Sequence, residues 1–159
     1  MLNIRNKIAV TIAIIISATL FSCSHDTVFN ESVEIPASGW YKNNAVSFNV
    51  MILDSLQNYD FGIIVRNSVN YRYSNLYFFL TTEFPNGNIS RDTIECILAD
   101  HEGRWLGKGW GSIKENDILL NSNLRFPVNG EYKFLIQQAM RVDTLSGINN
   151  IGLSIVNSD

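Results

Sequence analysis

Apolar residues occupy every second position in a series of short segments that runs through most of the chain after residue 39. In VSFNVMI, four apolar residues from Val46 to Ile52 lie on one side of an extended segment, with Ser47 and Asn49 on the other. This period of two is typical of a β-strand that buries one face. We predict strands in the ranges 46–52, 61–65, 76–84, 94–98, 105–113, 118–126, 132–140 and 151–155.

Turn-forming stretches separate these segments, among them SLQNYD, EFPNGNIS and DHEGRW. In 105–113, by contrast, glycines alternate within the predicted strand itself, which indicates a bulge or a close approach of two backbones. No amphipathic helix is predicted between the strands. Residues 39–159 are therefore predicted to form one all-β domain, an antiparallel β-sandwich or jelly roll of about eight strands.

The N-terminal segment has a different pattern. Residues 1–7 carry Arg5 and Lys7 and no acid, and an apolar run follows from Ile8 to Leu20. A transmembrane helix needs about 20 consecutive apolar residues, and this run is shorter. Residues 1–22 are predicted to be a helical signal peptide that is cleaved on export.

Cys23 follows Leu20, Phe21 and Ser22, which resembles a bacterial lipobox. Such a cysteine receives a diacylglyceryl group on its thiol and becomes the first residue of the mature chain. Two or three acyl chains hold a protein on a membrane essentially permanently. We expect lipidation at Cys23, the alternatives being a retained signal anchor and ordinary secretory cleavage. The polar residues 23–38 are predicted to be a lipidated tether, part of which could instead dock as an edge strand.

Charge and cysteine content narrow the function. The chain carries a net charge of −3, and removal of residues 1–22, which hold two of 12 basic and none of 15 acidic residues, leaves −5. An acidic domain is a poor ligand for nucleic acid, so no nucleic-acid partner is expected. If Cys23 is acylated, Cys96 has no intramolecular partner for a disulfide, and we predict a small buried hydrophobe there.

No catalytic residue, cofactor or metal site is predicted. The two histidines, His25 and His101, lie in the expected tether and in a turn, outside any nucleophile motif. The densest group of acids matches no calcium-loop spacing and is predicted to form a solvent-facing edge; it consists of Asp92, Glu95, Asp100 and Glu102. A glycosidase would also need two carboxylates at a set separation, so a hydrolase stays a weak alternative. We predict that the protein is not an enzyme.

Aromatic residues are the more suggestive feature, because many lie near predicted strand ends. An amphipathic ring at such a place can stack on a sugar or fill a pocket of a protein partner. Packing in the core or at its rim is the alternative. The aromatic residues proposed as partner or glycan contacts are Trp40, Tyr71, Tyr73, Trp105 and Trp110.

Four separated blocks of sequence resemble the gliding motility lipoprotein GldH family of the Bacteroidetes. They are RNSVNYRYSNLYFFL (66–80), DTIECILAD (92–100), GRWLGKG (103–109) and GEYKFLIQQAMRVDTLSGINNIG (130–152). The resemblance implies a lipoprotein of the cell envelope, associated with the gliding machinery, with no catalytic role. We therefore expect a noncatalytic component that acts through protein–protein interaction, on the outer membrane and facing the periplasm. A lipid-anchored carbohydrate-binding module is the alternative.

Three polar residues of the last block are further candidates. Gln137 and Arg141 share a face opposite the apolar row of their segment, and we propose both as partner contacts. Gln138 points inward with that row and must find hydrogen bonds there. We expect it to bond a neighbouring strand or loop, such as the turn from Tyr73 to Asn75.

Overall fold

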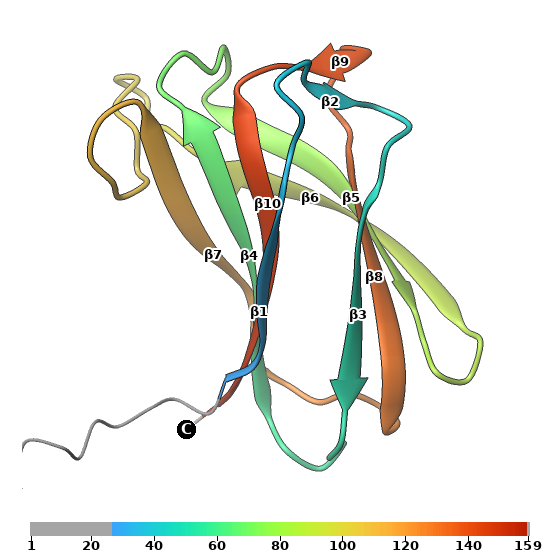
Figure 1. Cartoon of the computed structure of the whole chain (residues 1–159). Coiled ribbons are helices and arrows are strands. Elements are labelled where there is room, and N and C mark those ends of the chain that lie inside the picture. Colours follow the sequence, from blue (N-terminus) through green and yellow to red (C-terminus); the bar gives the residue numbers. More distant parts are fainter. Residues whose placement is uncertain (1–26, 159) are drawn as a thin grey trace, which may run out of the picture.

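The computed structural model describes residues 27–158, and these residues contain strands and no helix (Figure 1). No helix that could cross a membrane is therefore found in this part of the chain. Its ten strands are β1 (Thr27–Glu34), β2 (Trp40–Tyr41), β3 (Val46–Ile52), β4 (Tyr59–Ser68), β5 (Asn75–Glu83), β6 (Ile89–Ile97), β7 (Ile113–Leu124), β8 (Gly130–Gln138), β9 (Thr144–Leu145) and β10 (Ile148–Asn157).

The strands form two four-stranded sheets, with the orders β1-β10-β4-β7 and β3-β8-β5-β6, and the short strands β2 and β9 pair separately. All pairs are antiparallel. Among the eight long strands the first pairs with the last (β1 with β10), and β3 with β8, β4 with β7 and β5 with β6 follow as nested pairs. This nesting is the jelly-roll arrangement of two packed sheets, so the predicted fold class is confirmed.

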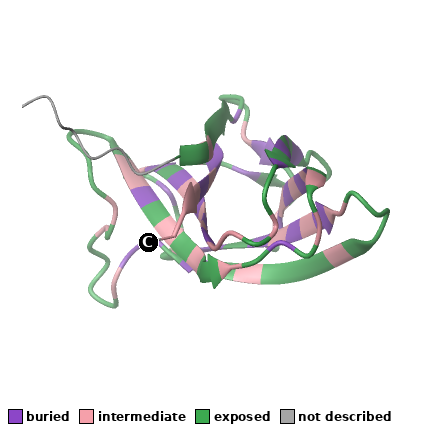
Figure 2. Cartoon of the chain, turned by 90° about the horizontal axis from the view of Figure 1, so that it is seen from below, coloured by how far each residue is buried: buried purple, intermediate pink, exposed green. Residues whose placement is uncertain are grey.

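The core lies between the sheets. Buried positions alternate with more exposed ones along β3, β4, β5 and β8, and Figure 2 colours the chain by burial, seen from below. Rings meet across the two layers: the centroids of Phe61 on β4 and Phe134 on β8 lie 5.2 Å apart. Full burial of a large apolar side chain stabilises a fold by about 1.5–3 kcal/mol, which makes this period-two pattern the main source of stability.

The sandwich begins before residue 39, as in the alternative in which part of the tether docks as an edge strand. Residues 27–34, placed in the tether, form edge strand β1, which pairs with β10 from Thr27 opposite Val156 to Glu34 opposite Asn150. Phe29 is its only partly buried residue and packs on Phe48. Backbone hydrogen bonds hold the strand with few buried side chains, so its alternation is weak. The signal peptide and Cys23 lie outside the described residues.

The strand predicted over 105–113 is wrong. This stretch is a loop with two isolated bridges, Ala99 to Trp105 and Lys108 to Glu115, and β7 starts only at Ile113. Gly109 and Gly111 have φ angles of 129° and 79°. These left-handed conformations turn the backbone and are incompatible with a regular strand.

The loops gather at the two ends of the sandwich (Figure 1). The end drawn at the top, here called the upper end, carries the segments 69–74, 98–112 and 139–147 and the β2–β9 pair. The opposite, lower end carries the segments 53–58, 84–88 and 125–129. The start of β1 and the finish of β10 also lie at the lower end.

Candidate functional site

Three of the four sequence blocks meet around Tyr71 at the upper end. The Tyr71 ring lies 5.6 Å from that of Tyr73 and 6.4 Å from that of Trp105, which comes from the β6–β7 loop. Gly147 of the last block is so close that a Cβ there would lie 3.0 Å from the Tyr71 Cα. The Tyr71 hydroxyl donates to the Asn75 carbonyl oxygen at 3.0 Å, and burial raises its pKa. Tyr71 thus holds the upper loops together.

Two of the proposed contact residues are core residues. The exposed fractions of Trp40 and Tyr71 are only 2% and 5%. Trp40 pairs with Leu145 between β2 and β9, and its indole N–H donates to the Asn44 carbonyl oxygen at 2.7 Å. A ring that is covered on both faces cannot stack on a sugar or enter a partner's pocket. Their proposed role as contacts is therefore corrected to packing.

A groove of about 530 Å³ opens beside Tyr73 on the outer face of the β3-β8-β5-β6 sheet. Its lining residues are Tyr73, Asn75, Tyr77, Ala139, Met140 and Arg141. The Asn75 amide donates to Glu95 at 2.7 Å, and a hydrogen bond to the same carboxylate raises the pKa of Tyr77. Arg141 is exposed and makes no ion pair with any described residue. The groove therefore offers aromatic walls and an uncommitted cation.

Trp110 is fully exposed, at 101% of its reference area, on the β6–β7 loop. The loop itself is well held: the backbones of Lys108 and Glu115 exchange two hydrogen bonds of 2.8 Å, and the Ser112 carbonyl accepts the Val69 N–H at 2.8 Å. Leu106 is 57% exposed on the same loop. These apolar side chains are presented to solvent by a fixed backbone.

Buried amides support this loop from below. Asn116 Nδ2 donates to Asn67 Oδ1 at 2.9 Å, and both side chains are buried. Gly107 lies directly above, where a Cβ would be 2.8 Å from Asn116 Oδ1. A second groove of about 300 Å³ runs between this loop and Ile97, which pairs with Asn75 of the first groove. One lining residue of each groove therefore lies on neighbouring strands, Asn75 on β5 and Ile97 on β6.

The two glutamines bond within the fold. Gln137 Nε2 donates to the Lys42 carbonyl oxygen at 2.6 Å. Gln138 is buried, donates to the Val142 carbonyl oxygen at 3.0 Å and accepts the Met140 N–H at 2.9 Å. The expectation that buried Gln138 finds its hydrogen bonds in a neighbouring loop is confirmed, but that loop is the turn after β8 and not the turn from Tyr73 to Asn75.

Leu106 is an exposed residue that the strand pattern did not predict, whereas Met140 packs partly against the core and also lines a groove. The strand predicted over 132–140 includes Met140, but β8 ends at Gln138. The chain turns there, so Met140 lines the groove, with its Sδ 3.3 Å from the Tyr77 backbone nitrogen. For Leu106, the glycines that follow it are a signal for a loop and not for a strand.

Reaction chemistry has little support among the described residues. Cys96 is buried, and its burial raises the pKa of the thiol to about 12. Asp100 accepts the N–H groups of Glu102 and Arg104 and pairs with the Arg104 side chain, which lowers its pKa. Between residues 27 and 158, no group of three or more His, Cys, Asp or Glu side chains could hold a metal ion.

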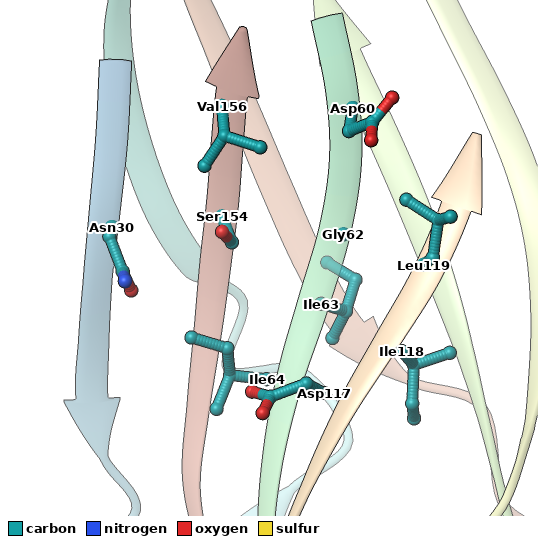
Figure 3. Close-up of a pocket in the computed structure, with 10 residues that line it drawn as sticks. All are labelled: Asn30, Asp60, Gly62, Ile63, Ile64, Asp117, Ile118, Leu119, Ser154 and Val156. Carbon is teal, nitrogen blue, oxygen red and sulfur yellow. The ribbon is translucent and has the colours of Figure 1, made fainter. Parts of the chain in front are cut away.

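A shallow depression of about 360 Å³ lies on the outer face of the β1-β10-β4-β7 sheet (Figure 3). Asn30, Ser154, Gly62 and Leu119 form one cross-strand row through it, and the missing side chain of Gly62 makes the hollow. The ten described residues that line it include no aromatic ring. It offers no stacking platform, so the upper end is the better candidate.

Comparison with known proteins identifies relatives along the whole chain. Residues 27–155 match the family described as GldH lipoprotein. The chain is 36% identical to the gliding motility lipoprotein GldH homolog of Christiangramia forsetii, over 98% of this chain and 99% of that protein. It is 32% identical to the gliding motility lipoprotein GldH of Flavobacterium johnsoniae, over 99% of this chain and all of that protein.

Solved structures resemble the chain only distantly. One is a family GH115 4-O-methyl-α-glucuronidase with specificity for decorated arabinogalactans, which matches 86% of this chain and 18% of its own length. Its TM-score is 0.47 and its sequence identity 11%. The family match and the two relatives, by contrast, cover the strands and the loops of both ends, and this chain belongs to the GldH lipoprotein family.

Proposed function

We propose that the protein is a noncatalytic, lipid-anchored component of the gliding motility machinery that binds an envelope protein through its upper end. The contact region, here called the upper surface, consists of Tyr73, Tyr77, Leu106, Trp110 and Arg141. Membership of a lipoprotein family whose named relatives are gliding motility lipoproteins supports the process. The residues of the upper surface support the mode of action.

The observation that carries the proposal is the exposure of Trp110 on a loop that is held by hydrogen bonds at both of its ends. Tryptophan, tyrosine and arginine are the residue types that contribute most to binding energy at protein interfaces. A backbone that is already ordered loses little entropy when it binds. A fixed loop with an exposed indole is therefore suited to a specific protein contact.

A carbohydrate-binding role is less well supported. Two of the aromatic residues proposed as glycan contacts, Trp40 and Tyr71, are buried and cannot stack on a sugar. Trp105 packs against Tyr71 at the edge of the core. Tyr73 is partly buried against the core, and the two more exposed rings come from different segments, Tyr77 from β5 and Trp110 from the β6–β7 loop.

The proposal includes a lipid anchor at Cys23, which becomes the N-terminal residue when the chain is cleaved after residue 22. In this proposal the acylated protein is held on the outer membrane and faces the periplasm. The sequence from Leu20 to Cys23 and the lipoprotein family support acylation. Mass spectrometry of the N-terminal peptide tests it directly. A bare thiol, or an intact leader, would contradict it.

The partner contact is tested by photo-crosslinking in the native host. In one variant a photoreactive amino acid replaces Trp110. In two matched variants it replaces Leu106 or Leu119 instead. Leu119 is as exposed as Leu106, at 59% against 57%, but lies on the outer face of β7. We expect an adduct with a specific envelope protein from positions 110 and 106 and none from 119.

Equal labelling from all three positions, or none from any, would count against the upper surface. The same protein on a glycan array, beside Trp110→Ala, separates the alternative. Binding to a defined glycan that Trp110→Ala abolishes would favour a carbohydrate module over a protein contact.

A further inference from the structure

The lower end exposes two leucines on one short loop. Leu53 and Leu56 lie in the β3–β4 connection, with exposed fractions of 80% and 78%. Single exposed leucines are common on protein surfaces, but two of them at one loop tip are more informative. Two such side chains on one loop suggest a contact with another surface.

The loop that carries them is well ordered. The Leu56 N–H donates to Asp54 Oδ1 at 2.8 Å, and the Ser55 N–H donates to Asn129 Oδ1 of the β7–β8 loop at 2.6 Å. The Tyr59 hydroxyl donates to the Asp54 carbonyl oxygen at 2.6 Å. These bonds satisfy polar groups of the loop, which lowers the cost of moving it out of water. The leucines are thus held outward by a fixed backbone.

The proposed lipid anchor is at the same end. Only residues 24, 25 and 26 separate Cys23 from the start of β1, because residues 27–34 form a strand and not a tether. Four extended residues span at most about 14 Å. Thr27, Val156 and Asp60 lie in one cross-strand row, so the start of β1 is about 10 Å from the strand that follows the leucine loop.

The short distance between Cys23 and the start of β1 limits what can contact the lower end. A folded domain of 100 residues has a radius of gyration of about 13 Å, so another domain does not fit between the bilayer and the lower end across a gap of about 14 Å. Arg125, an exposed cation beside the loop, donates to Asn58 Oδ1 at 2.8 Å and can face lipid phosphates. Aliphatic side chains with a nearby arginine suit a membrane interface.

We propose that the lower end rests on the bilayer, with Leu53 and Leu56 inserted at the level of the lipid headgroups and upper acyl chains. The inference rests on the proposed acylation of Cys23. This contact also fixes the orientation of the protein on the membrane. Because β4 has ten residues and spans about 33 Å, the upper surface lies about 33 Å from the membrane. The anchor and the leucine loop then form one membrane contact, and the partner site faces away from it.

The test uses full-length acylated protein in vesicles of phosphatidylethanolamine and phosphatidylglycerol. Leu53→Cys and Leu56→Cys carry an environment-sensitive fluorophore, and Leu106→Cys at the upper end is the matched control. Cys96 is buried with a raised pKa and does not compete for the label. We expect brominated lipids to quench the labels at 53 and 56 severalfold more than the label at 106, and aqueous iodide to show the reverse order.

Each other outcome overturns the inference in a distinct way. If mass spectrometry shows Cys23 acylated but iodide quenches all three labels equally, the membrane contact is wrong and the proposed function stands. If the thiol is bare, the anchor of the proposed function fails and the inference fails with it. If the labels are shielded in native membranes but not in pure vesicles, a protein covers the leucines.

Discussion

The upper and lower ends of the sandwich both expose apolar side chains, but the side chains differ in kind. The upper end presents the rings of Tyr77 and Trp110 as well as Leu106 and Arg141, whereas the described loops of the lower end expose Leu53 and Leu56, with Arg125 nearby, and no aromatic ring. Aromatic rings give directional contacts, whereas leucine gives contact area without direction. The difference in side chains is what leads us to propose a protein partner at the upper end and a membrane contact at the lower end.

The ends also differ in how their loops are held. Tyr71 and Gly147 link the upper loops through packing across several segments, whereas single hydrogen bonds hold the leucine loop. Damage to the upper core should therefore disturb the whole upper surface. Damage to one lower loop should stay local. Substitutions at the two ends should therefore differ in how much stability they remove.

Tyr71→Ala should lower the free energy of unfolding by about 3–5 kcal/mol, because it empties a buried aromatic site between three loops. Chemical denaturation measures the loss. Tyr71→Phe, which removes only the hydrogen bond to Asn75, should cost about 1 kcal/mol. Equal losses for both variants would mean that the hydroxyl, and not the ring, holds the upper loops.

Gly147→Ala should cost about 2–5 kcal/mol, because Gly147 has a φ of 91° and its new Cβ would press on the Tyr71 backbone. Gly87→Ala is the matched control in the lower β5–β6 hairpin. Its φ is 83° and nothing lies within 4 Å of the added Cβ, so we expect only the backbone cost of about 1–2 kcal/mol. Similar thermal shifts in the two variants would remove the claimed packing on Tyr71.

Asp100→Asn should destabilise the β6–β7 loop in a pH-dependent manner. The Arg104 side chain and the turn N–H groups lower the pKa of Asp100 in the folded state. A lowered folded pKa adds stability above the ordinary aspartate pKa of about 4, and that stability is lost as the pH falls through the folded value. The gap in melting temperature between wild type and variant should therefore narrow from pH 7 to pH 3. A gap that is constant with pH would contradict the ion pair.

Trp110→Ala and Leu56→Ser should each change the free energy of unfolding by less than about 0.5 kcal/mol, because both side chains are exposed. The two variants should differ in partner binding. We expect Trp110→Ala to abolish the crosslinked envelope partner and Leu56→Ser to leave it intact. Loss of the partner in both variants would mean that the two ends do not act independently.

The sequence predicted the sandwich well, because period-two alternation is local and the inward rows of β3, β4 and β8 are strong. It failed where long-range contacts decide. β1 has almost no buried face and is held by the backbone of β10, so its residues read as a tether. The glycines of 105–113 fit a strand by spacing, but positive φ angles at Gly109 and Gly111 make a loop.

The candidate site was predicted only in part, for the same reason. Tyr71, Trp105 and Trp110 lie in loops or at strand ends, and nothing local distinguishes a ring that packs from one that is exposed. Tyr71 is covered by residues up to 76 positions away, with Gly147 among them. Trp110 is exposed because the loop that holds it turns between two glycines. Exposure is a property of the assembled fold.

The sequence by itself determined the β-class, the family and the candidate anchor at Cys23, because each is written in neighbouring residues. Only the tertiary structure decided which aromatic rings face solvent and that 27–34 is a strand. It alone also placed the leucine loop at the same end of the sandwich as the start of β1. The physical reason is that burial and proximity arise from strand pairing between segments far apart in the chain, whereas periodicity and motifs are local.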